Sequence, residues 1–543
     1  MPNGIVPVPE PINEPVRAYA PGSPQKAALK ARVNELLAQE IEIPLVIGGQ
    51  EVRTGKMAEA VCPHDHHHVL GRYHMAGEKE VGQAIKASQK AWAEWSEMPW
   101  EHRAAVMLKA AELLAGPWRD TLNAACMLNQ SKTAYQAEID AACELIDFFR
   151  FNPYYMRFIY EQQPASQLGH WDYVEYRALE GFVFAVTPFN FASIAGNLPT
   201  SPALMGNTVL WKPASSAVYT AHWLMKLFEE AGFPPGVINL VPGSGGKVGN
   251  PVLASPLFAG VHFTGSTAVF HGMWKTIGDN IARYRSYPRI VGETGGKDFV
   301  FAHPSADAEA LATALVRGAF EYQGQKCSAA SRAYIPGSIW PRVKKLMREQ
   351  MAEIKVGPPT DFRNFMCAVI DRGAFDDITG FIRYAKRSND AKIRAGGTWD
   401  DSEGYYIQPT LVETTDPHFK LMEEEIFGPV LTVYAYDDND LAGALKLCDT
   451  TSPYALTGAI FAQDRAAAVK MTARLRHAAG NFYINDKPTG AVVGQQPFGG
   501  SRASGTNDKA GSYLNLIRWT SQRTIKENFV PPKHFAYPFM GEE

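Results

Sequence analysis

Short apolar runs alternate with amphipathic stretches between residues 181 and 294. Runs such as GFVFAVTP, which begins at Gly181, are rich in β-branched and aromatic residues and end at proline or glycine, which predicts buried strands. Between them, AVYTAHWLMKLFEEAGFP and STAVFHGMWKTIGDNIARY carry apolar residues at helical spacing. This alternation is typical of a parallel sheet covered by helices on both faces, with its ligand at the carboxyl ends of the strands.

A second region of the same kind covers roughly residues 297–490. The runs FVFAH, RAYIP, AVI, VLTVYAYD and GAIFAQD predict strands, and the helical stretches between them cover 306–324, 338–353 and 373–387. The chain therefore contains a second α/β domain.

The N-terminal part has a different pattern. Residues 1–25 are rich in proline and predict an extended arm, and residues 26–40 have helical spacing. LVIGGQEVR and HHVLGRYHMA predict short strands, and residues 79–163 are mostly helical. The contiguous histidines at 64–68 are interpreted as a polar turn in preference to a metal site, so no metal is expected.

Two separated segments alternate between polar and apolar residues like exposed strands. They are WDYVEYRALEG at 171–181 and LIRWTSQRTIKEN near the C-terminus. We interpret them as one small sheet that pairs across subunits, which predicts a homodimer or a larger homo-oligomer.

Charge and composition narrow the class of partner. A net charge of −3 and a pI of about 6.6 give no electrostatic reason to expect nucleic acid or an anionic membrane as partner. No apolar run is long enough to span a bilayer, and the N-terminus lacks the pattern of a signal peptide. We expect the partner to be a small molecule.

Cys327 differs from the other cysteines in its surroundings. It lies in YQGQKCSAAS, among polar and small residues, where a structural cysteine would prefer an apolar run. Six cysteines in 543 residues are too few for a disulfide framework. The other five are interpreted as inert reduced thiols: Cys62, Cys126, Cys143, Cys367 and Cys448.

Several polar residues follow predicted strands, and each has an ordinary structural explanation beside a chemical one. Asn190 is an oxyanion donor or a helix cap, and Glu293 is a general base or a turn residue. Lys212 binds a ribose or phosphate, or lies at the surface. Gly265 and Ser266 hold a phosphate or only begin a helix, and the glycines of PGSGGKVG (242–249) have the same two interpretations.

Together these stretches form a specific order: TPFNF, WKPA, FTGS, ETGGK, GQKCSA, EEEIFGP and PFGGSR. In this order they resemble the NAD(P)-dependent aldehyde dehydrogenase superfamily, from about residue 40 onward. PFGGSRASGTNDKAG, GQKCSAASR, TPFNFASIAGNLP and RWTSQRTIKE resemble the branch that oxidises L-glutamate γ-semialdehyde in the second oxidation of proline catabolism.

The resemblance implies an α/β fold class: the aldehyde dehydrogenase fold. It has two doubly wound α/β domains, one Rossmann-like and NAD-binding and one catalytic, and a small β oligomerisation flap. On this chain the expected boundaries are 1–40 for the arm and first helix, 41–165 with 181–294 for the NAD-binding domain, 295–500 for the catalytic domain, and 166–180 with 512–543 for the oligomerisation strands.

The resemblance also implies roles for individual residues. Cys327 would be the nucleophile that forms a thiohemiacetal and then a thioester, Asn190 would stabilise the oxyanion, and Glu293 would activate the hydrolytic water. The cofactor is expected to be NAD, and its implied contacts are Thr187, Pro188, Lys212, Gly265, Ser266, Glu425 and Phe427.

The implied substrate contacts match both charged groups of glutamate semialdehyde. Ser328, Gly490 and Ala491 would bind the carboxylate, Glu144 the ammonium, and Phe191 and Phe498 the aliphatic stem. Glu144 could equally be an ordinary helix-surface residue.

Three alternatives remain at this point: a dehydrogenase for another semialdehyde such as succinate or α-aminoadipate semialdehyde, a non-catalytic NAD-binding scaffold, and a form that transfers the acyl group to CoA, which Glu293 disfavours. The expected compartment is the cytoplasm in a bacterium and the mitochondrial matrix in a eukaryote.

Overall fold

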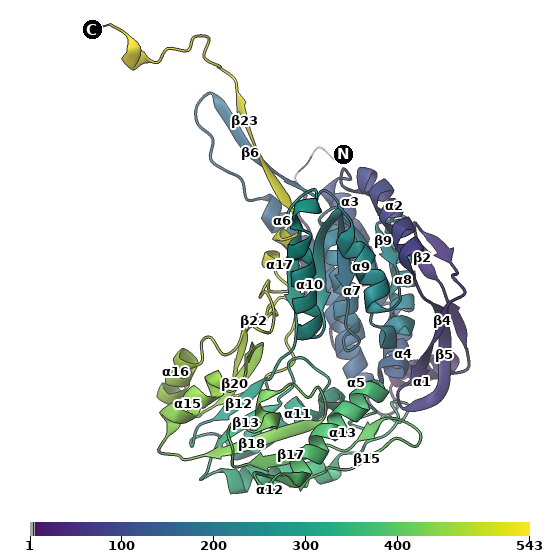
Figure 1. Cartoon of the computed structure of the whole chain (residues 1–543), viewed down its shortest axis with the longest axis vertical. Helices are drawn as coiled ribbons and strands as arrows, with labels where there is room; N and C mark the ends of the chain where they lie inside the picture. Colours follow the sequence, from purple (N-terminus) through teal and green to yellow (C-terminus); the bar gives the residue numbers. More distant parts are fainter. Residues whose placement is uncertain (1–3, 5, 543) are drawn as a thin grey trace.

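A computed structural model describes residue 4 and residues 6–542 of the chain, so residues 1–3 and 5 of the predicted arm lie outside the described residues. Two bodies of helices packed on sheets face each other across a recess, and a two-stranded ribbon projects from one of them (Figure 1). The bodies correspond to the two α/β regions that the hydrophobic pattern predicts.

The first body contains a seven-stranded sheet whose order is β11-β10-β7-β8-β9-β2-β3. Strands β11 to β9 are parallel, and the edge strands β2 and β3 are antiparallel. The strands are β2 (Leu45–Ile47), β3 (Gln50–Val52), β7 (Phe182–Val186), β8 (Thr208–Lys212), β9 (Ile238–Leu240), β10 (Phe258–Thr264) and β11 (Arg289–Glu293). Read from β9 to β11, the parallel strands follow the order 3-2-1-4-5, which is the order of a Rossmann sheet.

Helices cover both faces of this sheet, because its strands are apolar on both sides. Phe182 and Phe184 of β7 pack with α2, α9 and α10, whereas Val183 and Ala185 belong to the core on the opposite face. The helices are α2 (Glu78–Trp95), α3 (Trp100–Ala115), α4 (Arg119–Gln130), α6 (Leu145–Tyr160), α7 (Ala192–Leu204), α8 (Val218–Ala231), α9 (Gly245–Ala254) and α10 (Thr267–Asp279).

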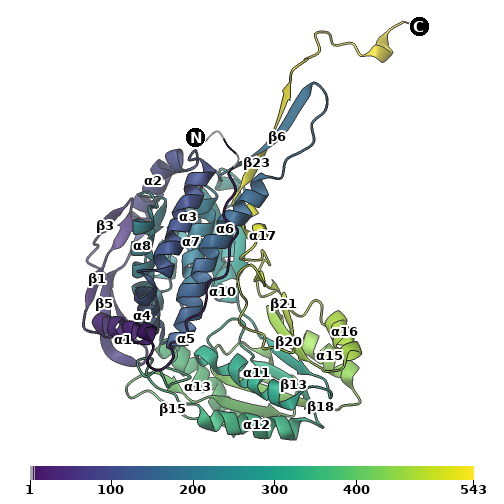
Figure 2. The same cartoon turned by 180° about the vertical axis from the view of Figure 1, so that it is seen from behind.

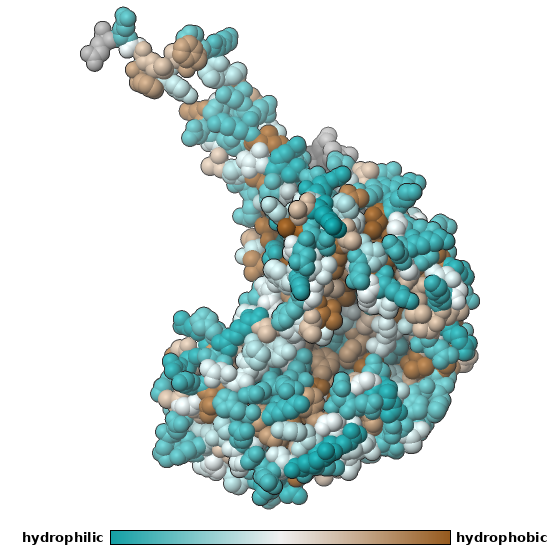
Figure 3. Space-filling view, in the orientation of Figure 1, coloured by the Kyte–Doolittle hydropathy of each residue, from teal (hydrophilic) through white to brown (hydrophobic). Residues whose placement is uncertain are grey.

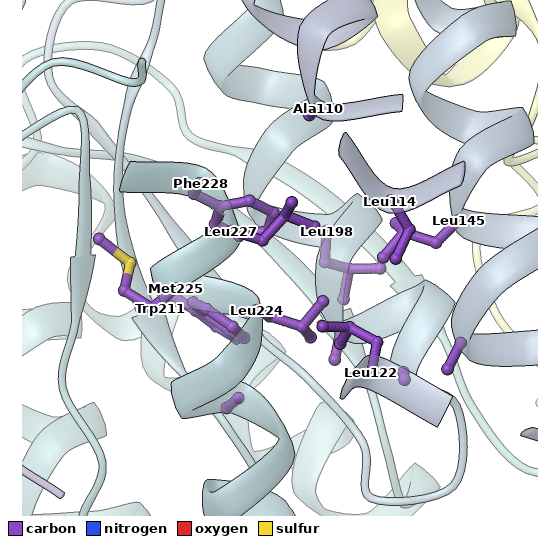
Figure 4. Packing of buried hydrophobic residues seen from close by; sticks show 14 of the residues in the cluster. Ala110, Leu114, Leu122, Leu145, Leu198, Trp211, Leu224, Met225, Leu227 and Phe228 are labelled. Carbon is purple, nitrogen blue, oxygen red and sulfur yellow. The ribbon is translucent and has the colours of Figure 1, made fainter. Parts of the chain in front are cut away.

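The larger core lies between the sheet and helices α3, α4, α6, α7 and α8 (Figure 4). Trp211 of β8 packs there against Leu224 and Phe228 of α8, and Leu198 of α7 lies beside them. These helices therefore form two layers on one face of the sheet. The sequence pattern did not predict α7, because Pro199 and Pro202 lie within it.

The second body contains another seven-stranded sheet, with the order β14-β17-β18-β13-β12-β20-β21. All pairs are parallel except β14 with β17. The strands are β12 (Phe299–Ala302), β13 (Arg332–Pro336), β14 (Ala391–Ala395), β17 (Thr410–Thr414), β18 (Val430–Tyr436), β20 (Thr457–Phe461) and β21 (Asn481–Ile484). The covering helices are α11 (Ala308–Phe320), α12 (Trp340–Glu353), α13 (Arg372–Arg387), α15 (Leu441–Thr450) and α16 (Arg465–Arg474).

The prediction of a strand at AVI, residues 368–370, is wrong. The backbone N–H of Ala368 donates to Ser131 Oγ, that of Val369 to the Tyr405 carbonyl and that of Ile370 to Gln325 Oε1. Since these N–H groups bind side chains and a loop, the buried apolar segment does not join the sheet.

The histidine run is also not a turn over its whole length. Only His64 lies in the turn, and β5 (Asp65–His74) begins at the next residue and pairs with β4 (Met57–Cys62). The second body stabilises this hairpin: the His66 N–H donates to the Glu403 carbonyl at 3.0 Å, and the Tyr405 N–H donates to the Pro63 carbonyl at 3.1 Å. β1 (Ile41–Ile43) completes a three-stranded sheet with these strands.

The two exposed segments pair with each other, as predicted. β6 (His170–Arg177) and β23 (Ser521–Asn528) form an antiparallel ribbon in which Ser521 is opposite Arg177 and Asn528 is opposite His170. The ribbon and the C-terminal tail extend away from the body, and Figure 3 shows apolar side chains along them. The exposed apolar residues there are Leu168, Trp171, Phe529, Val530, Phe535, Tyr537, Phe539 and Met540.

Candidate active site

A cavity of about 790 Å³ opens at the carboxyl ends of the first sheet. The chain runs from β7 to β8 and β9 on one side and returns to β10 on the other, so a crevice forms where the strand order reverses. All seven residues predicted to bind the cofactor line this cavity, together with Asn190 and Cys327: Thr187, Pro188, Lys212, Gly265, Ser266, Glu425 and Phe427.

Two helices begin at the wall of this cavity. Ser266 is the N-cap of α10, and its Oγ accepts a hydrogen bond from the Val269 N–H. Gly245 and Gly246 begin α9 and also line the cavity, which favours the ligand-contacting interpretation of PGSGGKVG that the sequence left open. Unpaired N–H groups at helix starts favour an anionic group such as a pyrophosphate.

Lys212 supplies a nearly buried cation that forms no ion pair with a carboxylate of residue 4 or residues 6–542. It ends β8, it is 9% exposed, and its Nζ donates to the Pro213 carbonyl at 3.0 Å. Burial lowers the pKa of Lys212 to about 8. Its remaining N–H groups can donate to ligand hydroxyls in the cavity.

Glu425 lies on the opposite wall of the cavity. Its Oε1 accepts the Gly296 N–H at 2.9 Å, and burial raises its pKa to about 7. A Cβ atom at Gly295 would come within 2.3 Å of Glu425 Oε2, so a side chain there would displace this carboxylate from its present position. Phe427 has a φ of 55° and packs edge-on against Phe189, with ring centroids 5.8 Å apart.

Cys327 is half-buried and lines the same cavity. A left-handed turn precedes it, with φ values of 51° at Tyr322 and 56° at Gln323. The side-chain carbonyl of Gln325 accepts the Ile370 N–H at 2.8 Å, so the misassigned segment 368–370 supports the cysteine loop.

The electrostatic surroundings of Cys327 favour the neutral thiol. Burial raises the pKa of the Cys327 thiol well above its ordinary value, and nearby carboxylates, Asp298 first, raise it further. The protein alone therefore does not hold a thiolate, and a positive charge in the cavity would be needed to favour one.

Asn190 is held by its own side chain and by its neighbours. Its Nδ2 donates to the Gln325 carbonyl at 3.1 Å, which leaves the second N–H of the amide for another acceptor. Gln130 Nε2 donates to the Phe189 carbonyl at 2.6 Å, and Asp140 accepts the first two N–H groups of α7. The Asn190 amide thus contacts the nucleophile loop, and hydrogen bonds with Gln130 and Asp140 hold the backbone on either side of Asn190.

Glu293 ends β11, just outside the residues that line the cavity. Its Oε2 accepts the Gly500 N–H at 3.4 Å, and its backbone pairs with Gly505. Burial raises the pKa of Glu293 well above its ordinary value, whereas the Gly500 N–H and the Lys509 ammonium oppose that shift. A carboxyl group with a raised pKa suits proton transfer near neutral pH.

The predicted substrate residues lie outside the 790 Å³ cavity, beyond Cys327. Ser328 Oγ donates to Thr489 Oγ1 at 2.9 Å, which links the nucleophile loop to the loop that contains Gly490 and Ala491. Gly490 is exposed and has a φ of 96°, a conformation that favours glycine. Phe191 and Phe498 are half-buried.

Glu144 ends a π-helical segment, Glu138–Glu144, and is half-buried. Its carboxylate is among the groups that raise the pKa of the Cys327 thiol, so it lies within electrostatic reach of the nucleophile. Burial and the Asp140 carboxylate raise the pKa of Glu144 to about 8. The half-buried position and the raised pKa favour a position inside the structure over a fully exposed helix surface.

The sequence patterns missed several residues that line the cavity. The omitted residues include Asn250, Leu253, Phe263, Val269, Met273 and Thr294. The apolar ones look like ordinary core positions in the sequence, and only their place beside the crevice distinguishes them.

The cavity suits a dinucleotide. It combines enough volume with two helix starts, the Lys212 ammonium and the Glu425 carboxylate. These groups match the two riboses and the pyrophosphate of NAD.

Comparison with known proteins agrees with this geometry. The sequence profile of the aldehyde dehydrogenase family matches residues 51–525. The chain belongs to the aldehyde dehydrogenase family. The aldehyde dehydrogenase fold expected from the sequence is thereby confirmed.

Curated relatives of this aldehyde dehydrogenase extend over nearly the whole chain. It is 52% identical over 536 residues to Delta-1-pyrroline-5-carboxylate dehydrogenase, mitochondrial, from Dictyostelium discoideum, covering 98% of this chain and 96% of that protein. It is 47% identical over 529 residues to the human protein of the same name, covering 97% and 94%.

Solved structures give the same assignment. The Delta-pyrroline-5-carboxylate dehydrogenase of Mycobacterium tuberculosis, bound with NAD, matches with a TM-score of 0.96 and 52% identity, covering 99% of this chain and 100% of that one. The 1-pyrroline-5-carboxylate dehydrogenase from Thermus with bound NAD matches with a TM-score of 0.90 and 32% identity, covering 96% and 99%.

The described residues contain neither a membrane-spanning helix nor a cluster of metal-binding side chains. Residue 4 and residues 6–542 include no helix that combines the length and apolar character needed to cross a membrane. In that same part of the chain, no group of three or more His, Cys, Asp or Glu side chains could hold a metal ion.

Proposed function

We propose that this aldehyde dehydrogenase oxidises L-glutamate γ-semialdehyde, which forms from Δ1-pyrroline-5-carboxylate, to L-glutamate with NAD⁺ in proline catabolism. The observation that carries the proposal is the convergence of Cys327, Asn190 and the seven predicted cofactor residues on one cavity. Relatives of nearly full length and about half identical sequence carry the name of this activity, which supports the choice of substrate.

Cys327 would attack the aldehyde carbon, and its Sγ would form the new bond of a thiohemiacetal. The free N–H of the Asn190 amide would donate to the oxyanion that develops on the former carbonyl oxygen. When bound, NAD⁺ would accept the hydride from this captured carbonyl and would bring a positive charge towards the thiol. Loss of the hydride leaves a thioester on Cys327.

Glu293 would take a proton from the water that hydrolyses the thioester. Its carboxyl group accepts the Gly500 N–H, does not line the cofactor cavity, and is among the groups that raise the pKa of the Cys327 thiol, which supports a role near the nucleophile. Hydrolysis then releases L-glutamate and restores the Cys327 thiol. A CoA-dependent transfer would not need this carboxyl group.

The residues assigned to the cofactor have matching chemistry. Lys212 would donate to the adenosine ribose, Gly265 and Ser266 would hold the pyrophosphate, and Glu425 would accept from the nicotinamide ribose, with Phe427 beside it. Thr187 and Pro188 would line the adenosine side of the cavity.

The residues assigned to the substrate would distinguish it from simpler aldehydes. Ser328 and the N–H groups of Gly490 and Ala491 would bind the α-carboxylate, and Glu144 would pair with the α-ammonium. Phe191 and Phe498 would enclose the aliphatic stem. The raised pKa of Glu144 implies that the substrate's ammonium group would favour its ionised form.

The assembly and the compartment are part of the proposal. Copies of the chain would associate as a homodimer or a larger homo-oligomer through β6 and β23, and the exposed Trp171 of β6, with Leu168, Phe529 and Val530 beside the ribbon, supports contact with another copy. The enzyme would act in the mitochondrial matrix of a eukaryote or the cytoplasm of a bacterium.

The domain boundaries would be those expected above, since one sheet ends at Glu293 and the next begins at Phe299.

A panel of aldehydes tests the function. The purified chain should reduce NAD⁺ with glutamate γ-semialdehyde at a kcat/KM at least tenfold above those for succinate and α-aminoadipate semialdehydes, because only the first matches both charged contacts and the stem length. Absence of NADH formation with all three would contradict the proposal, and a preference for succinate semialdehyde would contradict the substrate assignment.

A further inference from the structure

The N-terminal arm, residues 6–23, lies across the body without forming a regular helix or strand before α1 (Pro24–Leu37). Figure 2 shows it as the dark purple segment that runs along α6 towards α1. The mechanism above gives this segment no role.

Buried polar side chains of α4, the π-helical segment and α6 anchor the arm. The Arg17 N–H and the Tyr19 hydroxyl both donate to the Glu138 carboxylate at 2.8 Å, and Arg150 pairs with Glu14 at 2.7 Å. Hydrogen bonds to charged groups are stronger than neutral ones. The arm is therefore an integral part of this surface.

Asn13 connects this surface to a different part of the chain. Its Nδ2 donates to Asp147 Oδ2 of α6 at 2.8 Å and to the Val493 carbonyl at 2.8 Å. Its Oδ1 accepts a hydrogen bond from Gln495 Nε2 at 3.0 Å. A single amide thus uses both its donor and its acceptor groups to join α6 to the loop around residue 493.

The two connected elements both carry predicted substrate contacts. Asp147 lies three residues after Glu144, on the helix that continues directly from the π-helical segment. Val493 lies two residues after Ala491 in the loop assigned to the α-carboxylate. Asn13 therefore contacts both the helix next to Glu144, which is assigned to the substrate ammonium, and the loop next to Ala491, which is assigned to the substrate carboxylate.

The loop has fixed points besides Asn13, since Ser328 Oγ donates to Thr489 Oγ1 at 2.9 Å and the Val492 N–H donates to Gln496 Oε1 at 3.0 Å. Gly494 packs directly on α6, since a Cβ atom there would lie 2.1 Å from Phe151 Cε1. Phe498 is fixed further along by its backbone pairing with Ala510. On the other side of Gly490, Lys487 Nζ donates to the Thr489 carbonyl within the loop itself at 3.2 Å. The Asn13 bridge is thus a main connection between the arm, the loop and α6.

We infer that Asn13 is a positioning residue for substrate recognition, which sets the spacing between the carboxylate-binding loop and the helix that carries Glu144. The inference rests on the proposed function, because it concerns the two charged groups of an α-amino acid aldehyde. A substrate with both groups requires both contacts at a fixed separation, whereas a plain aliphatic aldehyde requires neither.

The test compares two aldehydes on the full-length enzyme. In Asn13→Ala, KM for glutamate γ-semialdehyde should rise about fivefold to twentyfold, the range expected when hydrogen bonds that fix a binding element are lost. The kcat/KM for propanal, which lacks both charged groups, should stay within about twofold of wild type. Ile12→Ala is the matched control, because the Ile12 side chain is 78% exposed and should leave both substrates unaffected.

Gln495→Ala provides a second variant that does not depend on the folding of the arm. Gln495 is exposed, so we expect the truncated chain to fold, and KM for glutamate γ-semialdehyde should rise as in Asn13→Ala. In the double variant, the fold increase in KM should be smaller than the product of the two single increases, because both variants break the same hydrogen bond. Amide hydrogen exchange of residues 488–496 should accelerate in Asn13→Ala without any ligand.

Two results would overturn the inference. One is an equal loss for propanal and glutamate γ-semialdehyde in Asn13→Ala, and the other is unchanged kinetics together with unchanged exchange of residues 488–496. If the wild-type enzyme itself fails to oxidise glutamate γ-semialdehyde, the proposed function fails instead, and the exchange measurement still decides whether Asn13 holds the loop.

Discussion

Cys327 and Glu293, the proposed nucleophile and the proposed water activator, are half-buried acids whose neutral forms the protein favours. The pKa of the Cys327 thiol and that of the Glu293 carboxyl are both raised by removal from water. The charge of Glu293 also raises the pKa of the Cys327 thiol. At the scale of single residues, therefore, formation of a Cys327 thiolate depends on charge that enters with the ligands.

The reactivity of Cys327 should depend on the charge of the nicotinamide ring. We expect NAD⁺ to accelerate alkylation of Cys327 by iodoacetamide near pH 7.5 at least severalfold, because a positive charge lowers the pKa of the thiol. NADH is the matched control, since its ring is neutral and its shape is similar. Mass spectrometry of the labelled peptide locates the modification, and equal acceleration by both nucleotides would exclude charge as the cause.

Glu293→Gln should separate acylation from hydrolysis. The amide cannot accept a proton from water, so we expect kcat to fall about 100-fold to 10,000-fold while the first turnover still releases NADH. A burst of NADH and an acyl adduct on Cys327, seen by intact-protein mass spectrometry, are the measurements. Loss of the burst would instead place Glu293 before hydride transfer.

At the scale of elements, one histidine connects β10 to α7 inside the core. His262 Nδ1 lies 3.0 Å from the Leu198 carbonyl, and its ring is 4.8 Å from that of Trp519. Burial lowers the pKa of His262 from 6.5 to about 3. The folded state therefore keeps the histidine neutral at pH values where the unfolded chain protonates it.

His262→Gln should flatten the dependence of stability on pH. Since the folded pKa is depressed, the contribution of neutral His262 is fully present above pH 6.5 and is lost as pH falls towards 3. Between pH 6.5 and 5 the wild type should lose about 1.5 kcal/mol of unfolding free energy more than the variant. Denaturant unfolding at the two pH values measures this difference. If wild type and His262→Gln lose the same unfolding free energy between these pH values, His262 is not the source of the pH dependence.

At the scale of the whole molecule, the ribbon of β6 and β23 projects from the body (Figure 1). Trp171 exposes a large apolar side chain on the ribbon, and Leu168, Phe529 and Val530 are exposed beside it. Exposed apolar surface of this kind favours contact with another molecule.

Ile525→Pro should disrupt the ribbon and reduce the size of the particle. The backbone N–H and C=O of Val174 bond to the Gln163 side chain, so the alternate pair, Ile525 opposite Tyr173, carries the hydrogen bonds between the strands. Proline at position 525 removes one of these backbone donors and fixes φ. Light scattering after size-exclusion chromatography should show a shift from the oligomer towards the monomer. Lys533→Ala, in the exposed tail beyond the strand, should leave the mass unchanged, and an unaltered mass of Ile525→Pro would contradict the role of the ribbon.

Most of the candidate site could be predicted from the sequence because its residues occur in contiguous motifs at strand ends. Lys212 and Gly265 follow apolar strands directly, so their place at one edge of a parallel sheet follows from the pattern. The role of Asn13 could not be predicted in this way. It lies more than 130 residues from Asp147 and 480 from Val493, and no local pattern shows that the three meet.

The apolar periodicity by itself determined that the chain forms two layered α/β bodies and an exposed strand pair, because burial on both faces of a strand leaves a direct trace in the sequence. Only the tertiary structure decided that residues 368–370 support the cysteine loop in place of joining a sheet, and that Glu144 lies within reach of Cys327. The physical reason is that hydrogen bonds and electrostatic fields depend on distances in space, which helix and strand periods do not encode.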